Sequence, residues 1–350
     1  MSDYLLLRNI RVENANAISG MTYGFPSPSN FLGYSHALSR SLQKKYGATV
    51  SLGGVGIICH QHQIQAHRIG YETVFSLTRN PITHEGKTAP FNEEGRMHLT
   101  VSLLIECNFD VTYLAINPEA DINLNEETPA QRQRSFINYV HEQAVNQRLA
   151  GGTITNIGNV NILSIDNNSE AGEREFRRWM LRLIPGFVLK DRHDALCTHH
   201  QARLIENTEA ELLDSWLDFI ALDSEAVLAD NFEGEPVEGE TTATWRFKPK
   251  PEAGYFVPLA VGFEAISALH EAGTVERARD NQVPFRFVES TYSIGQWLGP
   301  HRIKTPKDML WHYHHEEDEQ GGRYLCRGKT TQPAAPIIDL TDNTFYDDDY

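Results

Sequence analysis

Extended and helical patterns follow one another in the first 166 residues in an order that few folds accommodate. The extended stretches are residues 4–13, 50–68, 71–78, 96–107 and 159–165, and the helical ones run from Phe31 to about Gly47 and over residues 129–149. Residues 50–68 and 71–78 are expected to form one long hairpin that turns at His67–Gly70. The order is therefore β-α-β-β-α-β with elaborations. It predicts an α+β protein with a ferredoxin-like sheet, covered by two helices on one face and open on the other.

The second half of the chain has a more mixed pattern. Thr208 and Glu211 are expected to form a capping box for a helix, and the predicted apolar face of that helix includes Leu213, Trp216 and Leu217. The other predicted elements are helices over residues 173–184 and 264–272 and strands over 243–248, 255–262 and 285–292.

Three units follow from this pattern. Residues 1–166 form the ferredoxin-like unit with its hairpin insertion, and residues 167–329 form a mixed α/β half packed on it. Residues 330–350 are rich in Pro and Asp and are expected to form a flexible tail.

Negative charge is concentrated in three places along the 350 residues. The net charge is −16, yet residues 206–240 alone contain twelve acids and no Lys or Arg. EEDE at 316–319 adds four acids, and the tail from Asp339 adds five. The rest of the chain therefore sums to +5. A mildly basic body with acidic appendages can bind a polyanion on one face.

Membrane and redox features indicate a cytoplasmic protein without membrane contact. No apolar run approaches the ~20 residues of a membrane span, and no basic segment precedes the short apolar run at the N-terminus. The four cysteines are far apart and form no CxxC pair, so we expect reduced, buried thiols. They are Cys59, Cys107, Cys197 and Cys326.

Histidine-rich stretches are the main candidates for catalysis or metal binding. CHQHQIQAH contains Cys59, His60, His62 and His67, and WHYHHEED at 311–318 contains three more histidines. On a strand His60 and His62 face one way and Cys59 faces the other. HExxH, GxSxG, Walker A and a GxGxxG before a helix are all missing from the sequence. We therefore predict no catalytic residue, no metal and no cofactor, and expect polar hydrogen-bonding contacts on this strand.

Two basic stretches suggest contact with a polyanion. In the helix predicted over 173–184, four arginines lie away from the apolar stripe, as either a solvated face or a phosphate contact. They are Arg174, Arg177, Arg178 and Arg182. In FVESTYSIGQWLGPHRIKTPKDMLW (287–311), a strand is expected to lead into a turn with Trp297, amide and basic side chains. Such groups stack on bases and donate to phosphates, although a Trp packed beneath a surface turn is the alternative.

Three stretches together resemble a known family. They are NAISGMTYGFPSPSNFLGYSHALSR (16–40), GYFVPLAVGFEAIS (254–267) and RFVESTYSIGQWLGPHRI (286–303). In combination they resemble the small tail subunit of the type I-F CRISPR surveillance (Csy) complex, a family of the RAMP (repeat-associated mysterious protein) superfamily. The similarity covers roughly residues 4–327.

The resemblance implies a fold and a role. The fold is an RRM-related, ferredoxin-like (RAMP) fold with large insertions. The role is that of a non-catalytic subunit that grips the 5′ handle of the CRISPR RNA (crRNA), pairs with the large tail subunit and abuts the first backbone subunit. The assembly then finds double-stranded DNA by guide pairing.

With this role, we expect the loop at 18–30, the strand around His60–Gln63 and the turn at 295–304 to surround the RNA handle. Chemistry and motif position assign phosphate contacts to Arg40, Arg68, Arg302 and Lys304. Base or sugar contacts are assigned to Asn16, Gln61, Gln296 and His301, and stacking to Phe25 and Trp297.

Two other functions remain open. Some RAMP relatives process repeat RNA, so His60, His62 or His301 could serve an endoribonuclease. The chain could also be a protein adaptor that binds no RNA itself.

Overall fold

The computed structural model describes residues 2–47, 50–76, 82, 85–88, 94–108, 128–228, 243–278, 280–317 and 321–328. The first ten strands are β1 (Ser2–Asn16), β2 (Ile18–Ser19), β3 (Thr22–Tyr23), β4 (Ser51–Ile64), β5 (Ala66–Ile69), β6 (Glu72–Phe75), β7 (Arg96–Asn108), β8 (Arg148–Leu149), β9 (Gly152–Asn156) and β10 (Val160–Ile165). The others are β11 (Phe187–Asp191), β12 (Ser224–Leu228), β13 (Ala243–Phe247), β14 (Tyr255–Ala265), β15 (Val288–Leu298), β16 (Leu310–Glu317) and β17 (Gly322–Gly328). The helices are α1 (Pro28–Tyr46), α2 (Pro129–Val145), α3 (Glu170–Leu181), α4 (His193–Glu206) and α5 (Leu212–Ile220), with 3-10 helices η3 (Pro300–Arg302) and η4 (Pro306–Met309).

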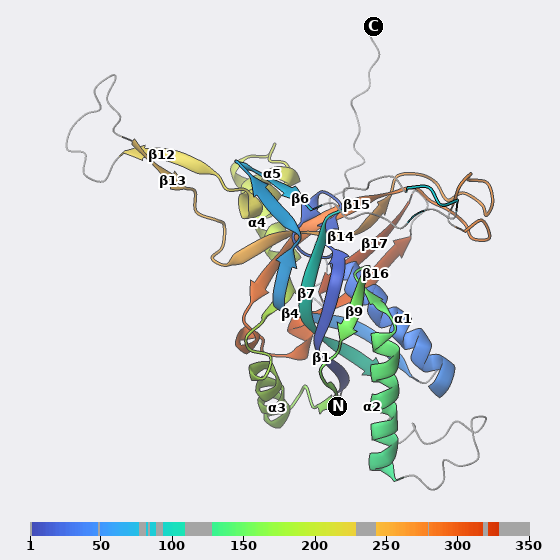
Figure 1. Cartoon of the computed structure of the whole chain (residues 1–350). Coiled ribbons are helices and arrows are strands. Elements are labelled where there is room, and N and C mark those ends of the chain that lie inside the picture. Colours follow the sequence, from blue (N-terminus) through green and yellow to red (C-terminus); the bar gives the residue numbers. More distant parts are fainter. Residues whose placement is uncertain are drawn as a thin grey trace.

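Within the described residues, one 11-stranded sheet organises the molecule (Figure 1). Its order is β11-β15-β14-β17-β16-β4-β7-β1-β9-β8, and β10 also pairs with β1. Each of these pairings is antiparallel. The predicted α+β class is therefore confirmed.

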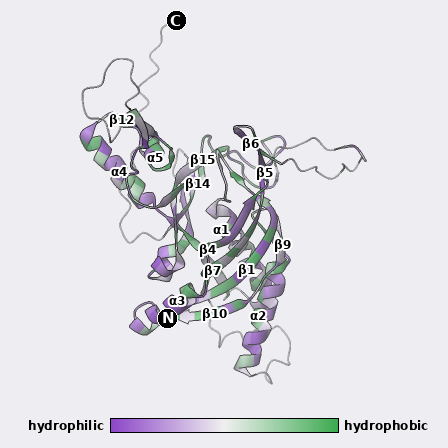
Figure 2. Cartoon of the chain, turned by 60° about the vertical axis from the view of Figure 1, so that its left-hand side comes forward, coloured by the Kyte–Doolittle hydropathy of each residue, from purple (hydrophilic) through white to green (hydrophobic). Residues whose placement is uncertain are grey.

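Helices α1 and α2 cover one face of the central strands. Leu5 and Leu7 of β1 belong to a buried cluster with Phe31 and Leu38 of α1 and Phe136 of α2. Burying side chains of this size contributes ~1.5–3 kcal/mol each. Figure 2 shows hydrophobic residues along the central strands and more hydrophilic residues on the outer faces of the helices.

Each of the two helices begins at a capping side chain. Ser27 Oγ accepts the N–H of Ser29 at 3.2 Å, and Pro28 occupies the first turn of α1. Thr128 and Gln131 form a reciprocal capping box at the start of α2. The predicted start of the second helix at residue 129 is thus confirmed.

The opposite face of the sheet is covered over part of its length. Tyr4 and Leu6 of β1 form a second buried cluster with Phe176 and Met180 of α3 and with Ile303, which follows η3. The expectation of a fully open second face is therefore wrong at this end. The apolar side chains of α3 are removed from water by packing against the sheet.

Strand β4 joins the two halves of the chain. Beyond its pairing with β7, its other edge pairs with β16 at Gly56–Leu310 and with β11 at Ile58–Val188. The path β4-β16-β17-β14-β15-β11 therefore returns to β4. Where its ends meet, Trp311 Nε1 donates to the carbonyl oxygen of Leu189 at 2.9 Å.

Several predicted elements differ from those in the structure. The long hairpin is wrong, because β4 pairs with β7 and only the short β5–β6 hairpin turns at Gly70 and Tyr71. No helix forms over 264–272, because β14 continues to Ala265, which pairs with Val288 of β15. In both places long-range strand pairing overrides the prediction made from local sequence.

Two further points concern the extent of the structure. The tail over 330–350 and the acidic segment from 229 to 240 lie outside the described residues.

Among the described helices, none combines the length and apolar character that a membrane crossing requires.

Candidate nucleic-acid interface

A row of polar side chains crosses the sheet on the face opposite α1 and α2. Gln61 of β4 pairs with Thr100 of β7, Thr100 with Arg11 of β1, and Arg11 with Asn156 of β9. Directly paired residues share a face, and the sequence neighbours of Thr100 point into the core beneath the helices. Arg11, Gln61 and Asn156 are exposed, and Thr100 is half-buried. These four residues, the polar row, have one positive charge and no acid.

A hydrogen-bond network lies beside the polar row. Gln65 Nε2 donates to Asn14 Oδ1 at 2.7 Å and lies 3.0 Å from His98 Nε2. The Asn14 N–H donates to His98 Nδ1 at 3.3 Å. Asn14 has a positive φ of 57° at an irregularity in the β1–β7 register. The network therefore orders a second set of polar groups on this part of the sheet.

His60 is held between the sheet and the segment after α3. Its Nδ1 lies 2.7 Å from the carbonyl oxygen of Pro185, and its Nε2 lies 2.7 Å from Ser102 Oγ. Ser102 Oγ also accepts the N–H of Asn9 at 3.0 Å, so its own proton is directed to Nε2. Because Pro185 oxygen can only accept, the neutral ring has its proton on Nδ1. Both ring nitrogens are occupied.

Helix α3 presents arginines at the covered end of this face. Its N-terminus is capped by Ser169, whose Oγ accepts the N–H of Gly172 at 3.2 Å. Arg177, Arg178 and Arg182 are exposed, while Arg174 lies 3.7 Å from Glu170. The Arg182 guanidinium stacks over the Trp179 ring at 4.7 Å and helps to line a surface hollow of about 420 Å³.

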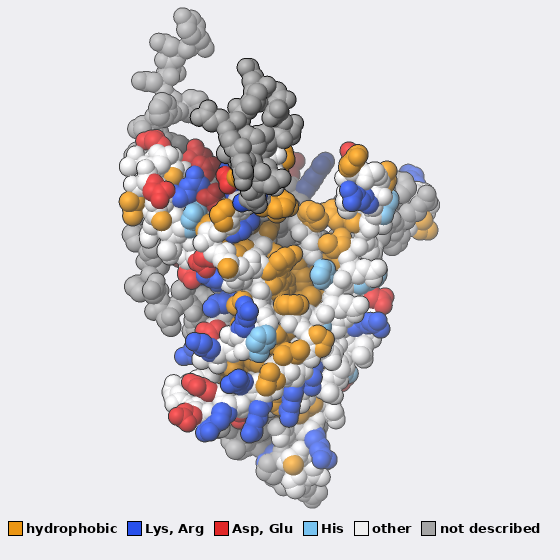
Figure 3. Space-filling model, turned by 90° about the vertical axis from the view of Figure 1, so that its left-hand side faces the viewer, with side chains coloured by type: hydrophobic (Ala, Val, Ile, Leu, Met, Phe, Trp, Pro, Cys, Tyr) orange, Lys and Arg blue, Asp and Glu red, His pale blue; other side chains and the backbone are white. Residues whose placement is uncertain are grey.

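The 3-10 helix η3 packs against α3 and adds further basic groups. His301, Arg302 and Lys304 are exposed, and Ile303 anchors the segment in the second core cluster. With the three exposed arginines of α3 they form the basic surface: Arg177, Arg178, Arg182, His301, Arg302 and Lys304. Figure 3 shows Lys and Arg gathered over the lower half of this side of the molecule and Asp and Glu gathered at its upper left.

The predicted stacking residues lie in a different place. The Phe25 ring meets the Trp297 ring edge-on, with centroids 4.9 Å apart, and both are half-buried against the core beneath α1. Gln296 is 6% exposed, and its Oε1 accepts from Arg192 Nη1 at 2.5 Å. Strand β15 extends to Leu298, so Gln296 and Trp297 are strand residues and the predicted turn begins only at Gly299.

The remaining predicted residues are dispersed. Asn16 Oδ1 accepts the N–H of Ile18 at 3.2 Å, and Arg68 Nε donates to the Gly70 carbonyl within the β5–β6 turn. Arg40 is exposed on α1, on the helix-covered side of the sheet. The structure therefore brings Gln61, His301, Arg302 and Lys304 to one side of the sheet. It places Arg40, Phe25 and Trp297 on the other.

The loop at 18–30 packs on strands of its own chain. The Met21 N–H donates to Tyr292 Oη at 2.9 Å, and Ser27 Oγ donates to the carbonyl of Ala260 at 2.7 Å. Tyr23 meets Phe75 of β6 edge-on, with centroids 6.0 Å apart. Met21 and Tyr23 nevertheless remain largely exposed.

Sequence reasoning missed Arg11, Thr100 and Asn156 of the polar row. Arg11 stands between the buried residues Ile10 and Val12, and this alternation is the pattern that identifies it. The irregularities in β1 obscure the pattern, because each shifts the residues that follow onto the other face.

Thiol and metal chemistry find little support in the site geometry. Burial raises the pKa of Cys59 and of Cys326 to about 12, so neither thiol supplies a thiolate at neutral pH. In the part of the chain that the structure describes, no group of three His, Cys, Asp or Glu side chains is placed to hold a metal ion.

Comparison with known proteins identifies the family. A family model described as CRISPR-associated protein (Cas_Csy2) matches residues 5–326. The chain is 38% identical over 328 residues to the CRISPR-associated protein Csy2 of Pseudomonas aeruginosa (strain UCBPP-PA14), which covers 91% of this chain and 93% of that protein. The resemblance found in the three sequence stretches is thus confirmed, and the chain belongs to the Csy2 family of CRISPR-associated proteins.

Proposed function

We propose that this chain is a non-catalytic, RNA-binding subunit of a CRISPR surveillance complex and that it holds the 5′ handle of the crRNA. The observation that most supports this is the polar row beside the basic surface. Exposed amide, hydroxyl and guanidinium groups on a sheet face can bond base edges and sugars, while adjacent arginines and Lys304 bind phosphates. A single-stranded handle offers both kinds of group.

The proposed fold assignment agrees with this role. The central strands lie in the order β10-β1-β7-β4, with α1 and α2 on one face. This order supports the proposal of a ferredoxin-like, RRM-related (RAMP) fold in which the remaining strands are insertions. Such modules bind single-stranded RNA on the face without helices. Here α3 covers one end of that face, and α3 and the segment at η3 supply the basic groups.

Protein partners form the second part of the proposal. We assign the chain a place beside the large tail subunit and the first backbone subunit, with target double-stranded DNA reached through the assembled complex. The exposed side chains of Met21 and Tyr23 support a neighbour at the loop at 18–30. The proposed units remain 1–166, 167–329 and the tail over 330–350, in a cytoplasmic assembly.

Binding of the handle tests the proposal. In the assembled complex, Arg11→Ala with Gln61→Ala should weaken handle binding by about tenfold, because a phosphate or base contact and an amide contact are lost. Lys44→Ala, an exposed lysine on α1 across the sheet, is the matched control. Equal affinities for the double variant and the control would remove the polar row from the interface.

The salt dependence tests the phosphate contacts separately. Arg302→Ala with Lys304→Ala should make the plot of log affinity against log salt shallower by about 1.4, since each contact to single-stranded RNA contributes about 0.7. An unchanged slope in the assembled complex would exclude both residues as phosphate ligands.

Two outcomes would favour the other functions. Incubation of the purified protein with repeat RNA, with and without a chelator, should leave the RNA intact. Specific cleavage that His60→Ala, His62→Ala or His301→Ala abolishes would instead show an endoribonuclease. Ultraviolet crosslinking of the complex should give an RNA adduct on this chain, and its absence would favour a protein adaptor.

A further inference from the structure

An acidic lobe stands apart from the proposed RNA face. It consists of α4, α5 and the two-stranded ribbon β12–β13, which projects from the body in Figure 1. Residues 206–240, which include α5 and β12, contain twelve acids and no Lys or Arg. The proposed RNA contacts therefore do not explain this lobe, because its charge repels phosphate.

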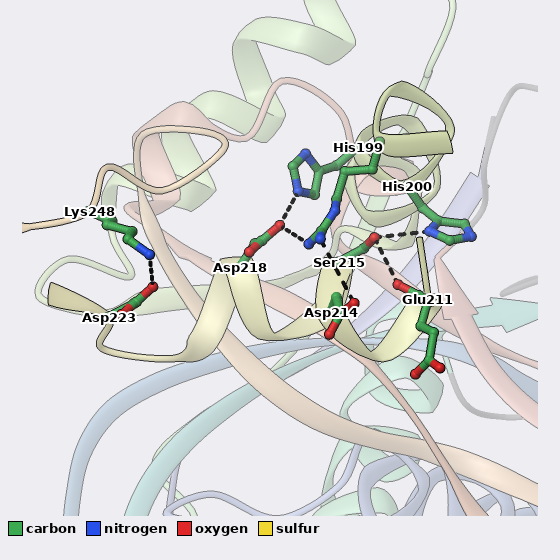
Figure 4. Close-up of polar contacts among 9 residues, drawn as sticks. His199, His200, Glu211, Asp214, Ser215, Asp218, Asp223 and Lys248 are labelled. Carbon is green, nitrogen blue, oxygen red and sulfur yellow. Dashed lines mark hydrogen bonds and ion pairs between the residues drawn. The ribbon is translucent and has the colours of Figure 1, made fainter. Parts of the chain in front are cut away.

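Helices α4 and α5 are fastened together by polar contacts (Figure 4). Arg203 Nη1 donates to Asp218 Oδ2 at 2.6 Å, and His199 Nε2 lies 2.8 Å from the same oxygen. The buried His200 Nδ1 lies 2.9 Å from Ser215 Oγ. These contacts hold α4 and α5 together, so the two helices can position the ribbon.

The base of the ribbon is anchored as well. Lys248 Nζ lies 2.5 Å from Asp223 Oδ2 (Figure 4), and the Lys248 N–H donates to the Asp223 carbonyl at 2.9 Å. Lys250 Nζ donates to the carbonyl of Ala221 at the end of α5. The ribbon therefore leaves the lobe in a defined direction.

One face of the ribbon is aromatic and uncovered. Trp245 and Phe247 of β13 are 77% and 72% exposed. They are two residues apart and so share a face. Their cross-strand partners are Ala226 and Ser224, which are too small to cover the rings. On the other face Arg246 stands opposite Glu225.

Such a ribbon is poorly stable alone in water. An isolated two-stranded ribbon is marginal without a hydrophobic face packed on something, and covering two large aromatic side chains would stabilise it. The predicted apolar face of α5 is also partly uncovered, with Leu213 57% exposed. The lobe therefore presents apolar groups among acids, in the pattern of a binding surface.

The charge of the lobe indicates which kind of molecule binds the ribbon. The described residues of the lobe, 193–228 and 243–250, contain eight Asp or Glu and four Lys or Arg. This net negative charge repels nucleic acid and anionic lipid, and a second copy of this chain would bring two negatively charged lobes together. We infer that the aromatic face of the ribbon docks another protein subunit through an apolar groove flanked by Lys and Arg. This inference rests on the proposed place in a multi-subunit assembly, and it assigns a surface to one protein contact there.

Paired substitutions in the purified ribonucleoprotein complex test the inference. Trp245→Ser with Phe247→Ser should weaken retention of a neighbouring protein subunit by about tenfold or more, as for buried aromatic anchors. Retention should also fall at high salt in the unsubstituted complex, because the flanking ion pairs are then screened. Thr244→Ala with Val227→Ala, on the opposite face of the same ribbon, is the matched control. Equal retention in both variants would overturn the inference.

A photocrosslinking residue at position 245 identifies the occupant directly. The expected adduct is a peptide of another protein subunit with Lys or Arg beside apolar residues. An adduct on RNA, on a second copy of this chain, or no adduct would each overturn the inference. Handle affinity is measured on the same complex. If the handle stays bound without a protein adduct, only this inference fails; if the handle is lost from the unsubstituted complex, the proposed function fails.

Discussion

His193 shows how one side chain can make the stability of this fold depend on pH. Its Nδ1 lies 3.2 Å from Ser293 Oγ, and Cys197 Sγ lies 3.4 Å from its Nε2. Burial, with the nearby charge of Arg327, lowers the pKa of His193 from 6.5 to about 4, while Asp191 and Asp194 oppose the shift. The folded protein therefore keeps this ring neutral under conditions that protonate it in the unfolded chain.

The sign of the pH effect follows from this shift. As pH falls below 6.5, the unfolded chain binds the proton first, so the free energy of unfolding should decrease toward pH 4. At pH 5 the contribution of His193 amounts to a loss of about 2 kcal/mol relative to pH 7. Chemical denaturation at both pH values checks it, with His193→Gln as comparison. The same pH dependence in wild type and His193→Gln would contradict the prediction.

At the scale of the element, α3 is the helix whose two faces have separate roles. Phe176 and Met180 are buried against the sheet, while Arg177 and Arg178 face outward without an ion-pair partner among the described residues. The apolar stripe places the helix, and this placement sets the basic groups beside the polar row. An amphipathic pattern therefore positions the basic surface as well as a core.

Substitutions on α3 separate a defined contact from a general charge effect. Arg177→Ala with Arg178→Ala should reduce handle affinity of the assembled complex by about tenfold at low salt, because two phosphate contacts are lost. Arg174→Ala should have a smaller effect, since that guanidinium lies near Glu170. Fluorescence anisotropy with a handle oligonucleotide measures both. If each removed arginine reduced the handle affinity by the same factor, the effect would come from net charge alone and not from a defined contact.

At the scale of the whole molecule, the return of the strand path to β4 joins the two halves of the chain in one sheet. Trp311 is 1% exposed, and its indole N–H donates across the junction between β16 and β11. Trp311→Phe leaves the Leu189 carbonyl without this donor, so the free energy of unfolding should fall by about 1–3 kcal/mol. Denaturation followed by circular dichroism measures the change. Trp245→Phe, on the exposed ribbon, is the control, and an equal effect of both would contradict the argument.

Local sequence predicted those features that depend on neighbours along the chain. The start of the helix at residue 129, the strand at 96–107 and the α+β class needed only side-chain periodicity along the chain. The uneven acidity of residues 206–240 was also visible, since charge is a property of composition. Of the residues that lie together in the candidate site, Gln61, His301, Arg302 and Lys304 were predicted from residue type.

Only the tertiary structure decided which faces are covered and which groups meet. Gln296 read as a polar turn residue, but strand pairing buries it beside Arg192. Arg11 joined the polar row only through its register with Thr100 and Asn156. Trp245 was left uncovered because its cross-strand partner is small. The physical reason is the same in each case: periodicity orients side chains within one element, whereas long-range pairing chooses the neighbours.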